Sequence, residues 1–82
     1  MLKASQLPKS AMPHTTYKGI SIEFTCTEEP PGRWMPSAIL TDSTTGEAST
    51  CTKPDVQNSL PDAIGVAYLE ARRRINAGTW RN

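Results

Sequence analysis

Few side chains in this sequence are of the kinds that bind metal ions or act as nucleophiles. The chain contains one histidine, His14, and two cysteines, Cys26 and Cys51. A closed zinc site needs four ligands at a recognisable spacing, which these residues do not supply. A cysteine nucleophile also needs a positioned base, and no base stands beside either thiol in the sequence. We therefore predict no metal site and no cofactor.

The adjacent carboxylates Glu28 and Glu29 precede a Pro-Pro-Gly segment. Carboxylates in such a turn are typically solvated, whereas glycosidase-type catalysis needs two carboxylates held across a cleft. One small sheet and one helix rarely form such a cleft. The 5 glycines are scattered and make no phosphate-binding loop. The sequence therefore indicates that the protein is not an enzyme.

Three consecutive arginines, Arg72, Arg73 and Arg74, are the most conspicuous charged motif. Consecutive helical residues point about 100° apart, so the three guanidinium groups cannot line one phosphate track. Glu70 precedes two of them by three and four residues, which is the spacing of intrahelical ion pairs. Arg72 follows Tyr68 by four residues, a spacing that favours stacking on the ring. The run is either a solvated helix end that complements the helix dipole or a contact for a phosphate or an acidic partner.

Val66 and Leu69 fall on the helix face opposite the apolar stripe, close to Arg73. Single exposed apolar residues are ordinary, so the patch is either chance exposure or a contact surface. We predict that Val66, Leu69 and Arg73 form an interaction surface for another protein or for a second copy of the chain, as in a homodimer. The alternative is a nucleic-acid module, for which Arg33 and Arg72 are the candidate contacts.

The elements that position these residues follow from the spacing of apolar side chains. Residues 1–16 hold neither a helical nor a strand period, so we predict a flexible N-terminal tail. A single α+β domain is expected over residues 17–82. Its first strand is predicted at residues 17–27, where apolar side chains alternate with polar ones.

A turn with Pro31 and Gly32 at its centre is predicted after the first strand, because glycine allows the positive φ of a type II turn. Residues 33–41 form the predicted second strand, in which Pro36 forces either a bulge or an unpaired edge position. Residues 47–52 form a weak third strand. On that strand we expect Cys51 to be partly exposed.

Connections this short give an antiparallel meander. In a meander the first and third strands flank the second and lie roughly 9–10 Å apart, beyond disulfide reach, so Cys26 and Cys51 are expected to stay reduced. A helix is predicted over residues 60–77, with Ser59 as its N-cap and Gly78 as its C-terminal stop. The placement of Trp80 stays open. The predicted fold is thus three antiparallel strands packed against one C-terminal helix (βββα).

The predicted core takes one face of the first two strands and one stripe of the helix. Its members are Ile20, Ile22, Phe24, Trp34, Ala38, Leu40, Leu60, Ile64, Ala67, Ala71 and Ile75.

Composition limits the partners. Lys and Arg number 9 against 8 Asp and Glu, and the formal net charge of +1 disfavours a general nucleic-acid coat. No apolar run approaches the roughly 18 residues that span a bilayer, and the first residues lack the apolar segment of a secretory signal. We expect a cytoplasmic protein that does not bind membranes.

Three segments carry a resemblance: Tyr17, Gly19 and Ile22; then Pro31-Gly32-Arg33-Trp34; then Pro61-Asp62-Ala63-Ile64. In this order they resemble small proteins carried by proteobacterial prophages and genomic islands, most of which have no assigned activity. The resemblance implies an accessory protein of prophage origin and names no reaction.

The predicted topology is also similar to the three-stranded DNA-binding modules at the N-termini of phage-type integrases, whose outer sheet face enters the major groove. In this sequence that face would carry Glu23 and Glu47, with Arg33 as its main cation. Each carboxylate facing phosphate opposes binding, so nucleic acid remains the second choice.

Overall fold

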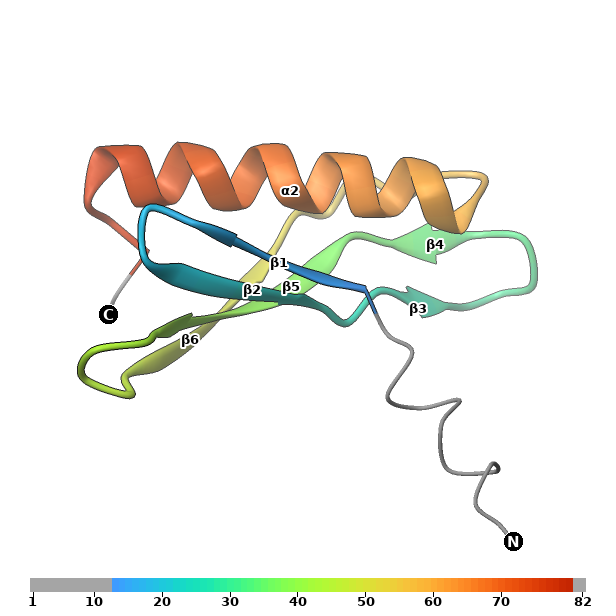
Figure 1. Cartoon of the computed structure of the whole chain (residues 1–82). Coiled ribbons are helices and arrows are strands. Elements are labelled where there is room, and N and C mark those ends of the chain that lie inside the picture. Colours follow the sequence, from blue (N-terminus) through green and yellow to red (C-terminus); the bar gives the residue numbers. More distant parts are fainter. Residues whose placement is uncertain (1–12, 81–82) are drawn as a thin grey trace, which may run out of the picture.

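A computed structural model describes residues 13–80 of the chain. Four strands, β1 (His14–Tyr17), β2 (Ile20–Phe24), β5 (Ser37–Asp42) and β6 (Ala48–Thr52), form one antiparallel sheet in the order β1-β2-β5-β6. The short strands β3 (Thr27–Glu28) and β4 (Trp34–Met35) pair beyond one end of the sheet, and α2 (Leu60–Ala77) lies across one of its faces (Figure 1). The α+β class and the C-terminal helix are confirmed.

The predicted three-stranded meander is incomplete, because β1 adds a fourth strand. β1 pairs with β2 from His14 opposite Glu23 to Tyr17 opposite Ile20. Lys18 and Gly19 make the connecting turn with φ values of 52° and 80°, as in the two-residue type I′ turns of tight hairpins. The predicted tail is therefore wrong for residues 14–16, and the turn divides the predicted first strand. Residues 1–12 of that tail lie outside the described residues.

Pro36 separates β4 from β5 without shifting the register. Phe24 faces Ala38 on one side of the break, and Thr27 faces Met35 on the other, three positions along both strands. The register shows no bulge, and the predicted edge position is wrong as well, because Pro36 immediately precedes β5, which lies between β2 and β6. Lys53 N–H donates to Pro36 O at 3.2 Å, and proline has no N–H to return the bond, so the pairing between β5 and β6 ends here.

The turn between β3 and β4 has the predicted geometry. Arg33 N–H donates to Pro30 O at 3.0 Å, which places Pro31 and Gly32 at the two central positions, and Gly32 has a φ of 84°. The Glu28 carboxylate accepts from the Gly32 N–H at 2.6 Å. Glu28 therefore serves the turn, in agreement with its assignment as a loop charge.

The helix begins and ends where its capping residues predict. Ser59 Oγ accepts from the Asp62 N–H at 3.2 Å, and Gly78 adopts the left-handed conformation with a φ of 75°. The Gly78 N–H bonds to the carbonyls of Arg74 and Ile75. These contacts satisfy backbone groups that a helix end otherwise leaves unpaired.

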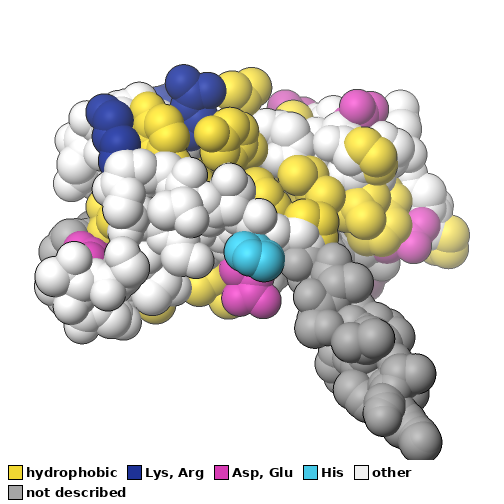
Figure 2. Space-filling view, in the orientation of Figure 1, with side chains coloured by type: hydrophobic (Ala, Val, Ile, Leu, Met, Phe, Trp, Pro, Cys, Tyr) yellow, Lys and Arg dark blue, Asp and Glu magenta, His cyan; other side chains and the backbone are white. Residues whose placement is uncertain are grey.

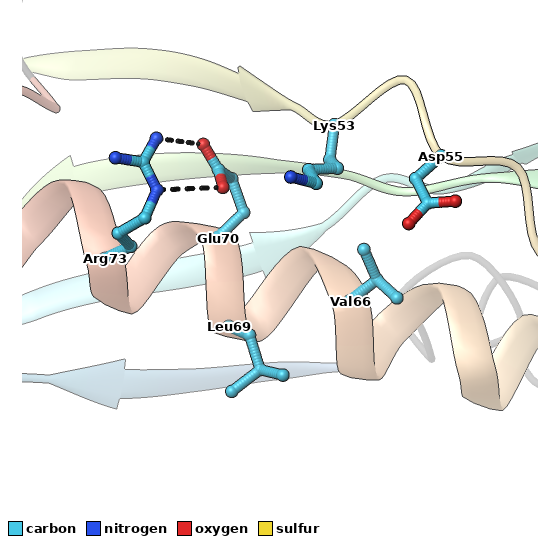
Figure 3. A pocket seen from close by; sticks show the side chains of 6 residues that line it. All are labelled: Lys53, Asp55, Val66, Leu69, Glu70 and Arg73. Atoms are coloured by element: carbon cyan, nitrogen blue, oxygen red, sulfur yellow. Dashed lines mark hydrogen bonds and ion pairs between the residues drawn. The ribbon is translucent and has the colours of Figure 1, made fainter.

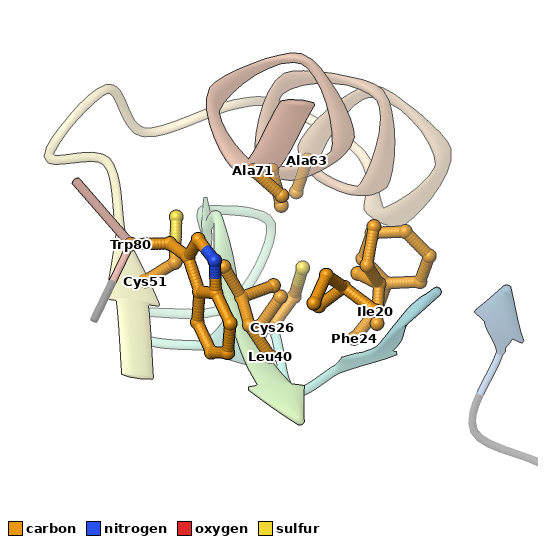
Figure 4. Close-up of a cluster of buried hydrophobic side chains, with 11 residues drawn as sticks. Ile20, Phe24, Cys26, Leu40, Cys51, Ala63, Ala71 and Trp80 are labelled. Carbon is orange, nitrogen blue, oxygen red and sulfur yellow. The ribbon is translucent and has the colours of Figure 1, made fainter. Parts of the chain in front are cut away.

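Small side chains bring the helix close to the sheet. Ala63, Ala67 and Ala71 are at most 1% exposed, and in Figure 4 the labelled alanines point toward the strands. Across from them lie Ile22 and Leu40, both fully buried. The predicted core is confirmed apart from its rim, where Trp34, Leu60, Ile64 and Ile75 pack against it while half-buried.

The predicted exposure of Cys51 is wrong. Cys51 lies opposite Ala38 on the helix side of the sheet and is 1% exposed. Its neighbour Ser49 also faces that side, because it pairs with Leu40. β6 has few apolar side chains that would identify its inner face. Because successive residues of a strand point to opposite faces, an error of one residue exchanges the buried and exposed faces. Cys26, which follows β2, and Cys51 on β6 are both free thiols, and β5 lies between β2 and β6, as predicted.

Trp80, whose position the sequence left open, closes the core beyond the end of α2. Its side chain is 7% exposed and lies beside Cys51 (Figure 4). We predict that Trp80→Ala lowers the free energy of unfolding by about 3 kcal/mol or more, since it removes a large buried aromatic group. Chemical denaturation measures the change. Thr79→Ala, the exposed neighbour, is the control and should stay within about 0.5 kcal/mol of the wild type; equal values for the two variants would contradict this placement.

Candidate functional site

The predicted interaction residues Val66, Leu69 and Arg73 line one shallow hollow of about 310 Å³. Lys53 and Asp55, from the segment that joins β6 to α2, form its opposite wall, and Glu70 completes the lining. In Figure 3, Lys53 lies between Glu70 and Asp55, while Leu69 points away from this wall. The structure thus brings the three predicted residues together on one surface.

Leu69 is the apolar centre of this surface. It is 62% exposed, far more than Val56, the other large hydrophobic residue that is exposed in the described part of the chain, at 37%. Val66 is half-buried, so of the two residues in the predicted exposed patch only Leu69 is strongly exposed. Its side chain lies beside the Lys53–Asp55 segment. The helical periodicity of the sequence did not predict that this segment covers Val66.

Glu70 holds two of the three arginines. It accepts from Nε and Nη2 of Arg73 at 3.2 and 2.7 Å and from Nε of Arg74 at 2.7 Å. The predicted ion-pair spacing is confirmed, although its burial was not predicted: Glu70 is only 7% exposed. The hydrogen bonds from Arg73 are the main cause that holds the pKa of Glu70 at about 2, below its usual 4.5.

One carboxylate between two guanidinium groups leaves one positive charge. Arg74 is 30% exposed and also donates to Thr52 O at 3.3 Å, whereas Arg73 is 65% exposed. The excess charge therefore faces solvent mainly at Arg73, beside Leu69. An apolar group bordered by a cation suits a partner that presents an apolar group beside an acid.

The two alternative nucleic-acid contacts do not converge. Arg33 follows the β3–β4 turn, and its neighbour Trp34 donates to Gln57 O at 2.8 Å, just before α2 begins. Arg72 lies twelve residues beyond Leu60, about 18 Å farther along the helix axis. Figure 1 shows the β3–β4 turn and the C-terminal end of α2 at opposite ends of the molecule.

Arg72 occupies a different setting from Arg73. Its guanidinium carbon lies 5.5 Å from the ring centroid of Tyr68, as predicted, and 5.2 Å from that of Tyr17, which was not predicted. Its Nε is buried and has no hydrogen-bond partner within the described chain. Tyr17 comes from β1, the strand that the sequence analysis missed.

The open face of the sheet carries hydroxyl groups rather than a basic track. Thr25, Ser37 and Thr52 form a chain of hydroxyl contacts of 3.1 and 3.3 Å across β5. His14 is exposed in β1 opposite Glu23, and Figure 2 shows the histidine next to an acidic side chain. Glu23 lies on the face expected to meet DNA, as predicted, and opposes binding there.

The other potentially reactive groups of the described residues are the metal-ligating side chains and the thiols. Residues 13–80 contain no group of three or more potential metal ligands. Burial raises the pKa of the Cys51 thiol, which works against its reactivity. In the same residues, no helix has the length and apolar character needed to cross a membrane. Comparison of the chain with protein-family models, with curated proteins and with solved structures finds no match.

Gly65 lies on the same side of α2 as Leu69, and it was not among the residues that the sequence singled out. It is exposed in the middle of α2, and a Cβ atom added to it would meet nothing within 4 Å. Glycine inside a helix costs about 1 kcal/mol relative to alanine. Nothing in the described chain requires glycine here, and Gly65 stands one turn before Leu69.

The ion pairs of Glu70 predict how stability depends on pH. Because the pKa of Glu70 is about 2 in the folded protein against a usual 4.5, ionised Glu70 stabilises the fold above pH 4.5. That contribution is lost as the pH falls toward 2. Glu70→Gln should lower the free energy of unfolding at neutral pH and flatten its decline in acid.

Urea unfolding at a series of pH values measures this effect. Glu23→Gln, which removes an exposed carboxylate from the open face, is the matched control and should retain the acid decline of the wild type. An unchanged decline in Glu70→Gln would show that other groups cause it.

Proposed function

We propose that this chain is a non-catalytic interaction protein whose partner is a second copy of itself, bound through the outer face of α2. The observation that carries the proposal is the exposed Leu69 at the centre of that face, one turn from a glycine that the monomer does not need. A role as an accessory protein of prophage origin, acting in the bacterial cytoplasm, is part of the same proposal and rests on the resemblance described above.

Gly65 and Leu69 complement each other in shape. They lie four residues apart and therefore on the same side of the helix. If two α2 helices pack antiparallel about a twofold axis between these positions, Leu69 of each copy lies over Gly65 of the other. The missing Cβ lets the second helix approach closely, and the leucine fills the space that this leaves.

The charges along α2 favour the antiparallel direction. Asp62 is the acidic residue of the first turn, and the excess positive charge lies at Arg73 in the C-terminal half. Within the described residues the Asp62 carboxylate has no ion pair. Antiparallel pairing brings the acidic half of each helix beside the basic half of the other, whereas parallel pairing puts like charges together.

The alternative, a nucleic-acid module, has less support. Its two candidate contacts, Arg33 and Arg72, lie at opposite ends of the molecule, and the net charge is only +1. A protein that neutralises many phosphates needs a continuous basic surface. Binding of the protein to a nucleic-acid duplex would nevertheless support this alternative, and it is tested below.

We predict that Leu69→Glu abolishes self-association, because the contact would bury an unpaired charge. Its free energy of unfolding should stay within about 0.5 kcal/mol of the wild-type monomer, since the side chain is exposed. Sedimentation of both proteins across the micromolar range measures association. Val56→Glu is the control: it places the same charge at the other exposed apolar residue and should associate as the wild type does.

Two outcomes would contradict the proposal. One is a wild type that sediments as a monomer throughout the range. The other is a wild type that binds mixed-sequence duplex in a salt-sensitive way and loses this binding in Arg33→Ala and Arg72→Ala, which is the behaviour expected of a nucleic-acid module.

Gly65→Ala separates monomer stability from association. Alanine favours the helix by about 1 kcal/mol, and its Cβ meets no atom of the monomer, so the monomer should become more stable. The same Cβ occupies the space proposed for Leu69 of the second copy, so the dissociation constant should rise about tenfold. Unfolding at low concentration and sedimentation measure the two effects; a more stable protein with unchanged association would rule out the Gly65–Leu69 contact.

A further inference from the structure

A second basic cluster lies on the side of α2 away from the hollow. Arg72 and Arg73 are consecutive, so their side chains leave the helix about 100° apart. Arg73 turns toward Glu70, while Arg72 turns toward Tyr17 and the β1–β2 turn. In Figure 2 the Lys and Arg side chains on this face gather at one end of the molecule, next to hydrophobic ones.

Lys18 is held in this cluster at a conformational cost. It is the only residue other than glycine with a positive φ in the described chain, at 52°. Asparagine or glycine is favoured at this position of a type I′ turn, and lysine is not. Its ammonium group donates to Asn76 Oδ1 at 2.8 Å and lies 5.6 Å from the centroid of the Tyr17 ring.

Arg72 is positioned just as firmly. The rings of Tyr17 and Tyr68 both contact its guanidinium group, and their planes meet at 83°. Because Nε is buried, a ligand would have to bind the terminal nitrogens of the guanidinium group. A planar guanidinium group whose orientation is set by aromatic contacts suits the oxygen atoms of a phosphate or a carboxylate.

No carboxylate neutralises these two cations among residues 13–80. The ion pairs there belong to Arg73 and Arg74, and the acceptor for Lys18 is the neutral amide of Asn76. The local field also acts on Tyr17, whose pKa is lowered first by its hydrogen bond to Asn76 and then by Arg72, with a smaller effect of Lys18. The cluster of Lys18 and Arg72 therefore carries two positive charges without an acidic partner among the described residues.

We propose that Lys18 and Arg72, held in place by Tyr17, Tyr68 and Asn76, form a binding site for the dianion of a phosphate monoester or of free phosphate. Both cations contact the ring of Tyr17, and their two positive charges match the two negative charges of the dianion. A phosphodiester carries a single charge at each phosphate and therefore matches this pair of cations less well. Neither Lys18 nor Arg72 lines the hollow beside Leu69, although Arg72 follows Leu69 by three residues and therefore borders the proposed self-association face.

The test titrates the full chain with inorganic phosphate at constant ionic strength while amide NMR spectra are recorded. We expect shift changes centred on Tyr17, Lys18 and Arg72. The informative variant is Lys18→Asn, because asparagine tolerates positive φ and lacks the ammonium group. Its phosphate affinity should fall about tenfold or more, while its Tm stays equal or rises.

Lys53→Asn is the matched control, since it removes the same charge at the hollow beside Leu69. It should bind phosphate as the wild type does. Unchanged affinity in Lys18→Asn would overturn the proposal, and so would equal losses in both variants, because equal losses indicate attraction to net charge alone.

A second titration distinguishes the sources of phosphate. It compares free phosphate with a dinucleotide that carries a 5′-phosphate and with the same dinucleotide without it. Binding of the phosphorylated form alone identifies a monoester site, and binding of free phosphate alone identifies an inorganic phosphate site. Equal binding of both dinucleotides would overturn the assignment to a dianion and indicate a phosphodiester.

Discussion

The contact between the alanine stripe of α2 and the buried centre of the sheet is the constraint on which the other features depend. Ala63, Ala67 and Ala71 place the helix backbone close to Ile22 and Leu40. A large side chain at any of these positions would lift or rotate the helix. Because the inner face of α2 is determined in this way, the direction of every outward side chain is determined with it.

The three arginines show this consequence clearly. Arg74 reaches Glu70 and the last carbonyl of β6, Arg73 pairs with Glu70 while facing solvent, and Arg72 lies against tyrosines from β1 and α2. A run that looks uniform in sequence therefore has three separate roles. The first is structural, the second provides surface charge beside Leu69, and the third contributes to a positive corner with Lys18.

Two residues of α2 and its neighbouring turn go against local preference. Gly65 weakens the middle of a helix, and Lys18 adopts a backbone conformation that favours glycine or asparagine. No contact within the described chain requires glycine at position 65, whereas Lys18 contacts Asn76 and the ring of Tyr17. Residues that conflict with local preference are concentrated at functional positions, where another requirement offsets their cost. Both proposals rest on this reasoning, since each assigns such a residue to a contact outside the monomer.

The sequence by itself determined the features that depend on near neighbours. Ser59 and Gly78 bound the helix, Pro31 and Gly32 make the turn, and Glu70 pairs with the arginines that follow it, because caps, turns and ion pairs act within a few residues. Alternation in β2 likewise identified its buried face. These signals require no knowledge of the rest of the fold.

Only the tertiary structure decided which elements meet. The parity of β6, with Cys51 facing inward, follows from its pairing with β5, because its own residues lack a strong apolar pattern. The burial of Trp80 and Glu70 depends on the helix lying over the sheet. Tyr17 reaches Arg72, and Lys18 reaches Asn76, because β1 occupies the sheet edge beneath α2. An edge position is set by strand order, which local spacing does not encode.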